Sequence, residues 1–440
     1  MNWIIRDARL FLPEGEREGD AWIVNGRWAA FGQIPSCAHG LAVQAKGAYL
    51  LPGLIDTHVH FREPGLTHKG NFYTESRAAV AGGVTTVFDM PNTYPPTTTL
   101  ERWEAKLQAI MGRSWANFGL YFGATADNLS DIRRLDPHRV PGVKVFLAAS
   151  TGELLLDNEE IVRRILRESP VRLLFHSERE VIVQAARAKW ESHSWEEVPD
   201  LHTKARPSEA CIESTRWLLQ EAHQGTVPFH ILHVTTAEEV GMLAERPPTV
   251  SAETCPVYLQ WSAEDFSTYR NLLKCNPSLK YHRDREALWQ GLMAGILDTV
   301  GTDHAPHLLE EKKLPYPQAP SGVPSLGFLL PWLWQLGQQR GVPLQFWLEK
   351  MVYAPARLWR LRDRGPLCEG YWADAVLFHP TGQTHVPEEH SPLHYGKCRW
   401  SPLNGAVLPG AISHVWVNGE LSFAHGRFQG APAGRPVELG

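Results

Sequence analysis

Two histidines one residue apart, in Asp56-Thr57-His58-Val59-His60, are the residues of this sequence best placed to do chemistry. They follow an apolar run, residues 49–55, which predicts a buried strand. Because side chains alternate along a strand, His58 and His60 point to the same face, with Asp56 beside them. Two imidazoles on one face form a chelate for a borderline metal such as zinc. The alternative is a pair of surface histidines in a loop.

Four later apolar runs also carry polar groups that could bind a metal or a substrate. In chain order these are Lys144 in residues 142–147, His176 at the end of 173–176, His233 in 230–235, and Asp303, His304 and His307 in 298–307. Helical patterns lie between the runs, at residues 74–81, 100–111, 159–168 and 210–223. Strands that alternate with helices and end in polar groups predict an α/β fold, a (β/α)8 TIM-like barrel with its site at the carboxyl ends of the strands.

Composition excludes several classes of function. The 440 residues carry a formal net charge of −5 without basic clusters, which argues against nucleic acid as a partner. Apolar runs stay below membrane-spanning length, and residues 1–7 do not resemble a signal peptide. The six cysteines are scattered without a Cys-x-x-Cys pair, which favours reduced thiols and a cytoplasmic location.

The motifs together resemble the amidohydrolase superfamily, and within it the dihydroorotases of the longer bacterial type. The resemblance runs from about residue 50 to Val415-Trp416-Val417-Asn418-Gly419, where Asn418-Gly419 predicts a hairpin turn. Its matching segments are residues 52–65, 81–86, 89–93, 144–146, 230–234, 276–277 and 302–307. The resemblance implies a barrel over residues 52–360 and a small β-sandwich built from both chain ends, 1–51 and 361–440. It also implies a homodimer.

The resemblance assigns metal ligands residue by residue. His58, His60 and Asp303 would hold one zinc ion, and His176 and His233 a second, with up to two ions per chain. Lys144 would bridge the ions as its carbamate, since an unmodified ammonium would be repelled by two cations; the alternative is a strand residue that faces solvent. His230 is interpreted as structural because it would face away from His233 on a regular strand.

The ions would share a hydroxide that attacks a ring amide carbonyl. Asp303 would act as general base and then as general acid, passing the proton to the leaving nitrogen; ligation alone is its other possible role.

Four further positions match the dihydroorotase pattern for the substrate: Arg62, Asn92, Asn276 and His307. Dihydroorotate has a free carboxylate, which a guanidinium group can bind through two hydrogen bonds with the help of neutral donors. The reaction implied is the reversible hydrolysis of dihydroorotate to N-carbamoyl-aspartate in pyrimidine (UMP) biosynthesis. The alternative for Arg62 is a surface salt bridge with Glu63.

Some positions depart from the dihydroorotase pattern. Ser177 replaces the usual cysteine after His176, Val257 follows the allantoinase-like Thr254-Cys255-Pro256, and Val323-Pro324 replace a glycine segment that meets the pyrimidine ring. Two alternatives therefore remain: an allantoinase or other cyclic-imide hydrolase, and a catalytically inactive scaffold related to dihydroorotases. The Pro-rich residues 313–322 predict a long loop over the active site.

Overall fold

Parallel strands form a closed barrel in the computed structural model, which describes residues 1–149 and 154–440. Strands β6–β8 pair in one sheet and β9–β14 in another, each in chain order, and Tyr121 alone separates β8 from β9. Val59 at the end of β6 pairs in parallel with His304 after β14, and the His60 amide donates to the His304 carbonyl at 2.8 Å. Counting β8 and β9 as one interrupted strand, the predicted eight-stranded barrel is confirmed.

The barrel strands are short and almost wholly buried. Because helices or the rest of the fold cover both faces of a parallel sheet, the sequences of such strands are continuously apolar and do not alternate between apolar and polar residues. The strands are β6 (Leu54–Val59), β7 (Val84–Asp89), β8 (Asn117–Leu120), β9 (Phe122–Gly123), β10 (Val143–Phe146), β11 (Leu173–His176), β12 (Phe229–Ile231), β13 (Val250–Thr254) and β14 (Thr299–Val300).

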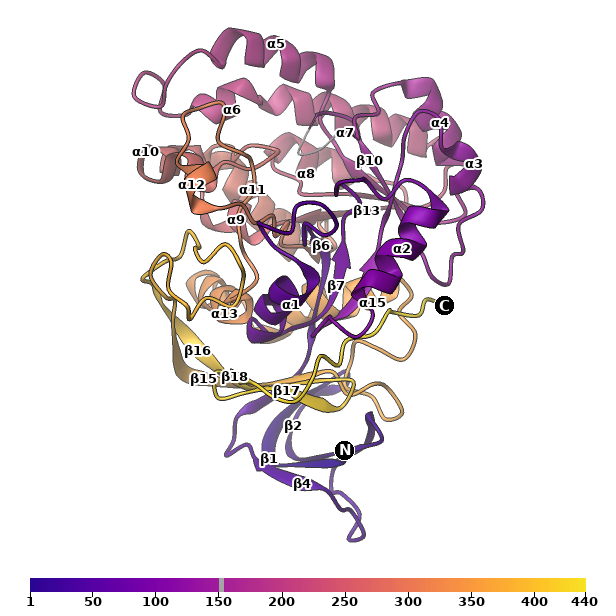
Figure 1. The fold of residues 1–440 in the computed structure, drawn as a ribbon, viewed down its shortest axis with the longest axis vertical. Helices are drawn as coiled ribbons and strands as arrows, with labels where there is room; N and C mark the ends of the chain where they lie inside the picture. The colour runs from indigo at the N-terminus through magenta and orange to yellow at the C-terminus, as the bar shows by residue number, and fades with distance from the viewer. Residues whose placement is uncertain (150–153) are drawn as a thin grey trace.

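Helices follow the barrel strands and surround them (Figure 1). The helix predicted at residues 159–168 has the same bounds in the structure, because Asn158 caps it by accepting from the Ile161 amide and apolar residues face the barrel on one side. The α-helices that follow the first three barrel strands are α1 (Phe72–Ala81), α2 (Leu100–Ile110) and α3 (Leu129–Ile132), and those of the middle of the chain are α4 (Glu159–Glu168), α5 (Glu180–Trp190), α6 (Leu201–Ala205), α7 (Ser208–Ala222) and α8 (Ala237–Leu243).

The last third of the barrel has shorter helical pieces. The α-helices are α9 (Pro256–Gln260), α10 (Phe266–Tyr269), α11 (His282–Met293), α12 (Leu309–Lys312), α13 (Leu329–Arg340), α14 (Leu344–Leu348) and α15 (Ala354–Leu358). Two 3-10 turns, Ala263–Asp265 and Arg270–Leu273, flank α10, and a π-helical turn, Glu349–Tyr353, joins α14 to α15.

Strands from both chain ends form a second sheet, called the end sheet below. It contains β1 (Trp3–Leu12), β2 (Gly15–Val24), β3 (Arg27–Gly32), β4 (Leu41–Gln44), β5 (Tyr49–Pro52), β15 (Ala375–His385), β16 (Val407–Val417), β17 (Glu420–Ala424) and β18 (Arg427–Phe428). The order is β18-β17-β16-β15-β5-β1-β2-β3, with β4 also paired to β1. In Figure 1 the C-terminal strands (yellow) lie between the barrel and the N-terminal strands (indigo).

The end sheet has a hydrophobic core of its own, separate from that of the barrel. It includes Trp3, Ile23, Trp28 and Trp416, so residues of both chain ends pack together. The predicted turn between β16 and β17 is confirmed, since Asn418 (φ 53°) and Gly419 (φ 74°) take the left-handed conformation of a two-residue hairpin. The predicted domain formed by both ends is thus present, whereas its boundaries at residues 51 and 360 stay a prediction.

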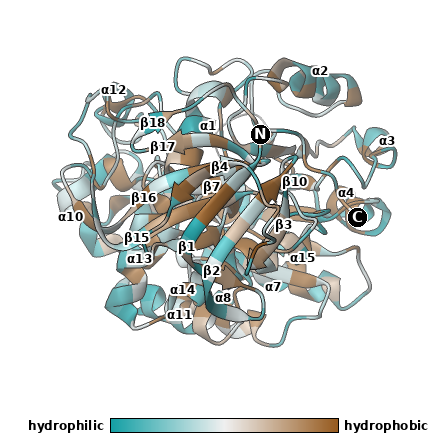
Figure 2. Cartoon of the chain, turned by 90° about the horizontal axis from the view of Figure 1, so that it is seen from below, coloured by the Kyte–Doolittle hydropathy of each residue, from teal (hydrophilic) through white to brown (hydrophobic). Residues whose placement is uncertain are grey.

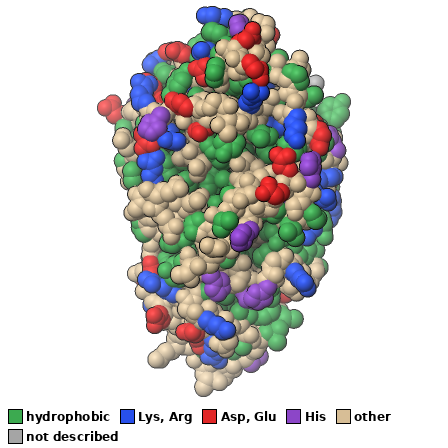
Figure 3. Space-filling model, turned by 90° about the vertical axis from the view of Figure 1, so that its left-hand side faces the viewer, with side chains coloured by type: hydrophobic (Ala, Val, Ile, Leu, Met, Phe, Trp, Pro, Cys, Tyr) green, Lys and Arg blue, Asp and Glu red, His purple; other side chains and the backbone are tan. Residues whose placement is uncertain are grey.

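The outer surface carries charged side chains of both signs. On the face shown in Figure 3, basic and acidic side chains are interspersed. Figure 2, seen from the side of the end sheet, shows strands at the centre with both apolar and polar stretches, and helices around them that also carry both kinds of residue. Among the described residues, the helices are all too short or too polar to cross a membrane.

Candidate active site

The structure brings His58, His60 and Asp303 together. Their nearest ligand atoms all lie within 4.8 Å of one another. Asp303 Oδ1 lies 3.0 Å from Nε2 of His60 and 3.3 Å from Nε2 of His58. The two histidines project inward from the end of β6, as strand alternation predicts, and Asp303 follows β14, the neighbour of β6 across the barrel closure. Nitrogen and carboxylate donors in this arrangement suit zinc.

A second pair of histidines lies beside this group. His176, the last residue of β11, has its Nδ1 atom 3.0 Å from Nε2 of His233, which follows β12. The rings of His233 and His58 are 5.4 Å apart between centroids, so the two groups adjoin. All four histidines are buried, and burial lowers the pKa of His60 to about 4 and the pKa values of His176 and His233 below their usual range. Those three imidazoles are neutral at pH 7, which is the state that binds a metal.

Lys144 lies inside the barrel, next to both histidine groups. It is the second residue of β10 rather than a residue at the end of the strand, and its side chain is 1% exposed, so it does not face solvent. After burial and closer groups, its charge also contributes to lowering the pKa of Asp303, His176 and His233, so the amine lies within electrostatic range of all three. Burial lowers the pKa of Lys144 to about 7. A large fraction of the amine is therefore uncharged near neutral pH, which is the form that can react with carbon dioxide.

Partners outside the centre fix which ring nitrogen three of the histidines present to it. His58 Nδ1 contacts Glu253 Oε1 at 2.6 Å, His60 Nδ1 contacts Asn92 Oδ1 at 2.8 Å, and His176 Nε2 contacts Glu178 Oε2 at 2.7 Å. If each of these nitrogens carries the proton, the other nitrogen of the ring is left to bind a metal.

Sequence reasoning did not identify Glu253 and Glu178 as parts of the site. Glu253, in the middle of β13, also lies 3.4 Å from His230, so the histidine interpreted as structural contributes to holding a partner of His58. Glu178 pairs with the buried Arg206, whose Nε donates to it at 3.1 Å. Glu253 lies within β13 and Glu178 two residues after the end of β11, and neither position indicates in the sequence which side chain the carboxylate contacts.

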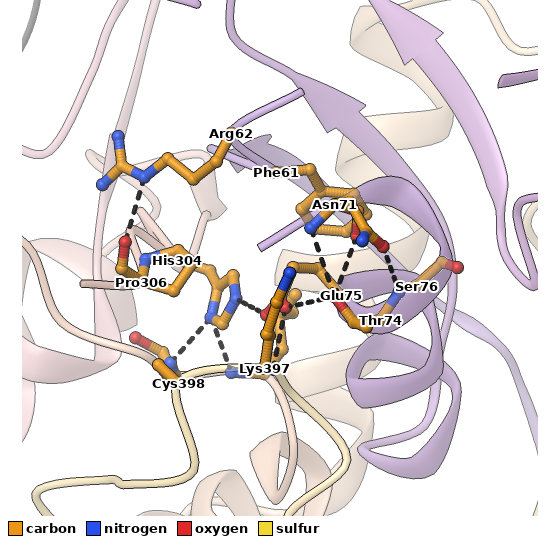
Figure 4. A network of polar contacts seen from close by, with 12 residues as sticks. Phe61, Arg62, Asn71, Thr74, Glu75, Ser76, His304, Pro306, Lys397 and Cys398 are labelled. Atoms are coloured by element: carbon orange, nitrogen blue, oxygen red, sulfur yellow. Dashed lines mark hydrogen bonds and ion pairs between the residues drawn. The ribbon is translucent and has the colours of Figure 1, made fainter. Parts of the chain in front are cut away.

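Arg62 is buried at the rim of the site and does not pair with Glu63. Its Nε donates to the Pro306 carbonyl at 3.1 Å, as Figure 4 shows, and its Nη2 lies 3.0 Å from Nε2 of His307. Glu63 instead accepts from Arg113 at 2.7 Å. Burial lowers the pKa of Arg62 to about 10 but leaves it charged at pH 7. Arg62 and His307, which the sequence predicts to bind the substrate, therefore lie side by side.

His307 is held as a neutral ring. Its pKa is well below the usual range because the ring is buried and lies beside Arg62. Lys69 Nζ lies 3.0 Å from Nδ1, while Nε2 lies 3.0 Å from the Ser321 carbonyl as well as from Nη2 of Arg62. The Trp400 indole donates to the His307 carbonyl at 2.7 Å. This bond attaches a loop of the C-terminal segment to residues 302–307.

A polar network joins the same motif to α1 and the C-terminal segment (Figure 4). His304 Nε2 contacts Glu75 Oε2 at 2.9 Å, while its Nδ1 accepts from the Ser325 amide at 2.9 Å. The other oxygen of Glu75 accepts from the Lys397 amide at 3.0 Å. His304 thus supports the loop between Asp303 and His307 rather than the metal group.

Asn276 lies at a cavity of about 210 Å³ beside the predicted loop. Its Oδ1 is 3.1 Å from Nε2 of His202, a residue of α6 that sequence reasoning missed. His202 Nε2 also faces the Cys275 carbonyl at 2.9 Å, so this nitrogen donates, and the amide group of Asn276 is turned to donate elsewhere. The loop residues 316–321 line the same cavity.

Three residues of the site have unusual backbone conformations. Arg62 (φ 67°), His233 (φ 39°) and Asp303 (φ 48°) adopt positive φ values that L-residues with side chains rarely take. Such strain clusters at functional sites, where the surrounding structure holds it in place.

Comparisons with known proteins agree with this geometry. The amidohydrolase family matches residues 49–421. A dihydroorotase of Methanosarcina acetivorans is 32% identical over 96% of this chain and 94% of that protein. An allantoinase of Streptomyces avermitilis is 31% identical over 98% of this chain and 97% of that protein. The solved structure of an L-hydantoinase (dihydropyrimidinase) from Arthrobacter aurescens has a TM-score of 0.90 and 26% identity, covering 99% of both chains.

Proposed function

The chain belongs to the amidohydrolase family, and from this premise we propose that it is a zinc-dependent dihydroorotase, which hydrolyses dihydroorotate reversibly to N-carbamoyl-aspartate. The observation that carries the proposal is the buried Arg62 beside His307, a cationic donor at the rim of the metal group with no carboxylate bound to it among the described residues. A substrate carboxylate would supply the missing counter-ion.

The donors at the centre fit two zinc ions. His58, His60 and Asp303 would hold one, His176 and His233 the other, and a carbamate of Lys144 would join them. Bound zinc lowers the pKa of water to near neutrality and polarises a carbonyl group. The buried, neutral imidazoles and the low pKa of Lys144 support this assignment.

Asp303 is suited to move the proton. Although burial alone would raise its pKa, the neighbouring His58 and His60 lower the pKa to about 2. The carboxylate is therefore ionised at neutral pH, can accept a proton from the attacking water, and can return it to the ring nitrogen that leaves. The amide C–N bond breaks, a carboxylate forms on carbon, and the nitrogen leaves protonated.

Substrate recognition provides the decisive experiment. Arg62→Met should weaken the use of dihydroorotate by about ten- to a hundredfold, since a charge-assisted hydrogen bond contributes about 1.5–3 kcal/mol and each ~1.4 kcal/mol is tenfold. Uncharged dihydrouracil, if it reacts, should be nearly indifferent because it has no carboxylate. Steady-state kinetics on both compounds checks this; equal losses would mean that Arg62 supports the fold or the metals.

Allantoinase is the second candidate. The supporting observations are the 31% identity to an allantoinase and the Thr254-Cys255-Pro256 segment. Assays of dihydroorotate, allantoin and hydantoin side by side distinguish the two, and a purified, zinc-loaded chain that opens none of these rings would favour the inactive scaffold. The homodimer and the role in pyrimidine biosynthesis stay predictions that rest on the resemblance to dihydroorotases, and the cytoplasmic location stays a prediction that rests on the scattered cysteines.

A further inference from the structure

The cavity beside Asn276 has a strongly cationic lining. It lies between α5, α6 and the loop residues 316–321, and the side chains of Arg187, Arg206 and Lys274 all border it. None of the described residues that line it is acidic. The cavity adjoins the metal group, because Arg206 Nη2 lies 3.5 Å from His176 Nε2 and the Ser321 carbonyl lies 3.0 Å from His307 Nε2.

The positive charges are only partly compensated. Arg206 pairs with the buried Glu178, and the exposed Arg187 has one contact at 3.3 Å with Glu191 on its own helix. Lys274 is buried and donates to two carbonyls of the loop, Pro317 at 2.9 Å and Ala319 at 2.5 Å, but is in an ion pair with none of the described acidic groups. Three basic side chains thus border one small, water-accessible space, and the buried carboxylate of Glu178 pairs with one of them, Arg206.

Two groups that line the cavity, Lys274 and His202, respond to this positive potential. After burial, which is the larger cause, repulsion by Arg187 and Arg206 lowers the pKa of Lys274 to about 7. Burial and then the charges of Lys274 and Arg206 hold the pKa of His202 well below its usual range. An anion in the cavity would relieve this repulsion, whereas a neutral ring would not.

We infer that the cavity is an anion subsite at the mouth of the active site, and that it binds a carboxylate of the ring-opened acid. The inference rests on the proposed function only in that hydrolysis of a cyclic amide by water always forms a carboxylate. The subsite lies outside the Arg62–His307 pair, so an acid with two carboxylates can be bound at both places. Clefts lined with one sign of charge raise the local concentration of the opposite ion and speed its association.

Arg187→Gln tests the subsite, because Arg187 is exposed, borders the cavity and is outside the catalytic machinery. The matched control is Lys189→Gln, which removes the same charge from the same helix, where Lys189 lies 4.9 Å from the Trp190 ring and away from the cavity lining. Isothermal titration of the zinc-loaded chain at low salt would use succinate and N-carbamoyl-aspartate, with uncharged succinamide as the neutral probe.

The expected result is that Arg187→Gln weakens binding of both acids about three- to fivefold, the effect of one unit charge a few ångströms away in water. Lys189→Gln and the succinamide titration should be unchanged, and the effect should shrink at high ionic strength. The Arg187-dependent part should persist in Arg62→Met. Equal weakening in Arg187→Gln and Lys189→Gln, or no weakening in either, would overturn the subsite. If the chain opens allantoin instead of dihydroorotate, the succinate result still decides the inference.

Discussion

Glu253 determines how His58 is presented to the metal group. The carboxylate is buried, and burial would raise its pKa, but His58 and His230 lower it to about 2. It is therefore a fixed negative charge behind the ring, which raises the basicity of the metal-binding nitrogen.

Removing this charge should weaken metal binding. We expect Glu253→Ala to lower the zinc affinity about 10–100-fold, the usual effect of losing a residue that orients a metal ligand. Competition with a chelator measures the affinity, and Glu238→Ala, an exposed carboxylate paired with Arg283, is the control. An unchanged affinity in Glu253→Ala would mean that β6 alone orients His58.

Asp303 gives a prediction about pH. Because its pKa is lowered to about 2, the carboxylate stays ionised from pH 5 to pH 9 and does not cause the acidic limb of a rate profile in that range. Asp303→Asn should lower kcat by about 10²–10⁴-fold at every pH and leave the shape of the profile unchanged. A profile of kcat/KM against pH for both proteins checks this; a shifted acidic limb in the variant would contradict it.

At the scale of elements, Lys312 fixes the loop that lines the cavity. This last residue of α12 is 1% exposed, and its Nζ atom donates to three carbonyls: Lys274 at 3.0 Å, Pro320 at 2.9 Å and Gly322 at 2.9 Å. Gly322 has a φ of 147°, and a Cβ there would lie 2.5 Å from the Ala305 carbonyl, so the loop closes tightly onto the Asp303 motif.

We expect Lys312→Met to loosen this loop, because three carbonyls lose their donor and each hydrogen bond contributes about 0.5–1.5 kcal/mol. Amide hydrogen exchange of residues 316–323 should become faster and KM should rise more than kcat falls. Lys313→Met is the control, since its side chain is exposed and pairs only with Glu389 at 3.5 Å. Similar exchange in both variants would show that the prolines alone hold the loop.

Elements with local signals could be predicted from the sequence, and those set by distant contacts could not. The helix at residues 159–168 has a cap and an apolar face of its own. The break at Tyr121 has no such signal: its hydroxyl donates to the Thr57 carbonyl of β6 at 3.0 Å, a contact far away in the chain. The site divides in the same way. Alternation places His58 and His60 on one face, but the pairing of His58 with Glu253 spans 195 residues.

At the scale of the whole molecule, one buried cluster joins the barrel to the end sheet. Asp374, just before β15, accepts from Arg364, from Asn117 Nδ2 at 3.1 Å and from the Asn418 amide at 2.7 Å. Asn117 belongs to the barrel and Asn418 to the end sheet, and the side chains of Arg364, Asp374, Asn117 and Asn418 are all buried. The cluster therefore couples the stability of the two parts.

Asp374→Ala should destabilise the protein by about 3–5 kcal/mol, because it leaves the buried Arg364 without its carboxylate. Glu438→Ala, which removes an exposed pair with Arg362 at 3.8 Å, should cost at most about 1 kcal/mol. Calorimetric melting of the zinc-loaded proteins compares them. A single, lowered transition is expected for Asp374→Ala; two separate transitions would show that the barrel and the end sheet no longer unfold together.

The position of β5 has a consequence for the synthesis of the chain. This strand pairs with β1 on one side and with β15 on the other, and Gly53 alone separates it from β6, the strand of His58 and His60. A ribosome adding ~5–20 residues per second finishes β5 tens of seconds before Ala375 begins β15. During that time the outer edge of β5 offers unpaired amide and carbonyl groups to any neighbouring nascent chain. Translation speed and chaperone supply, as well as the stability of the finished molecule, should therefore determine how much active protein a cell obtains.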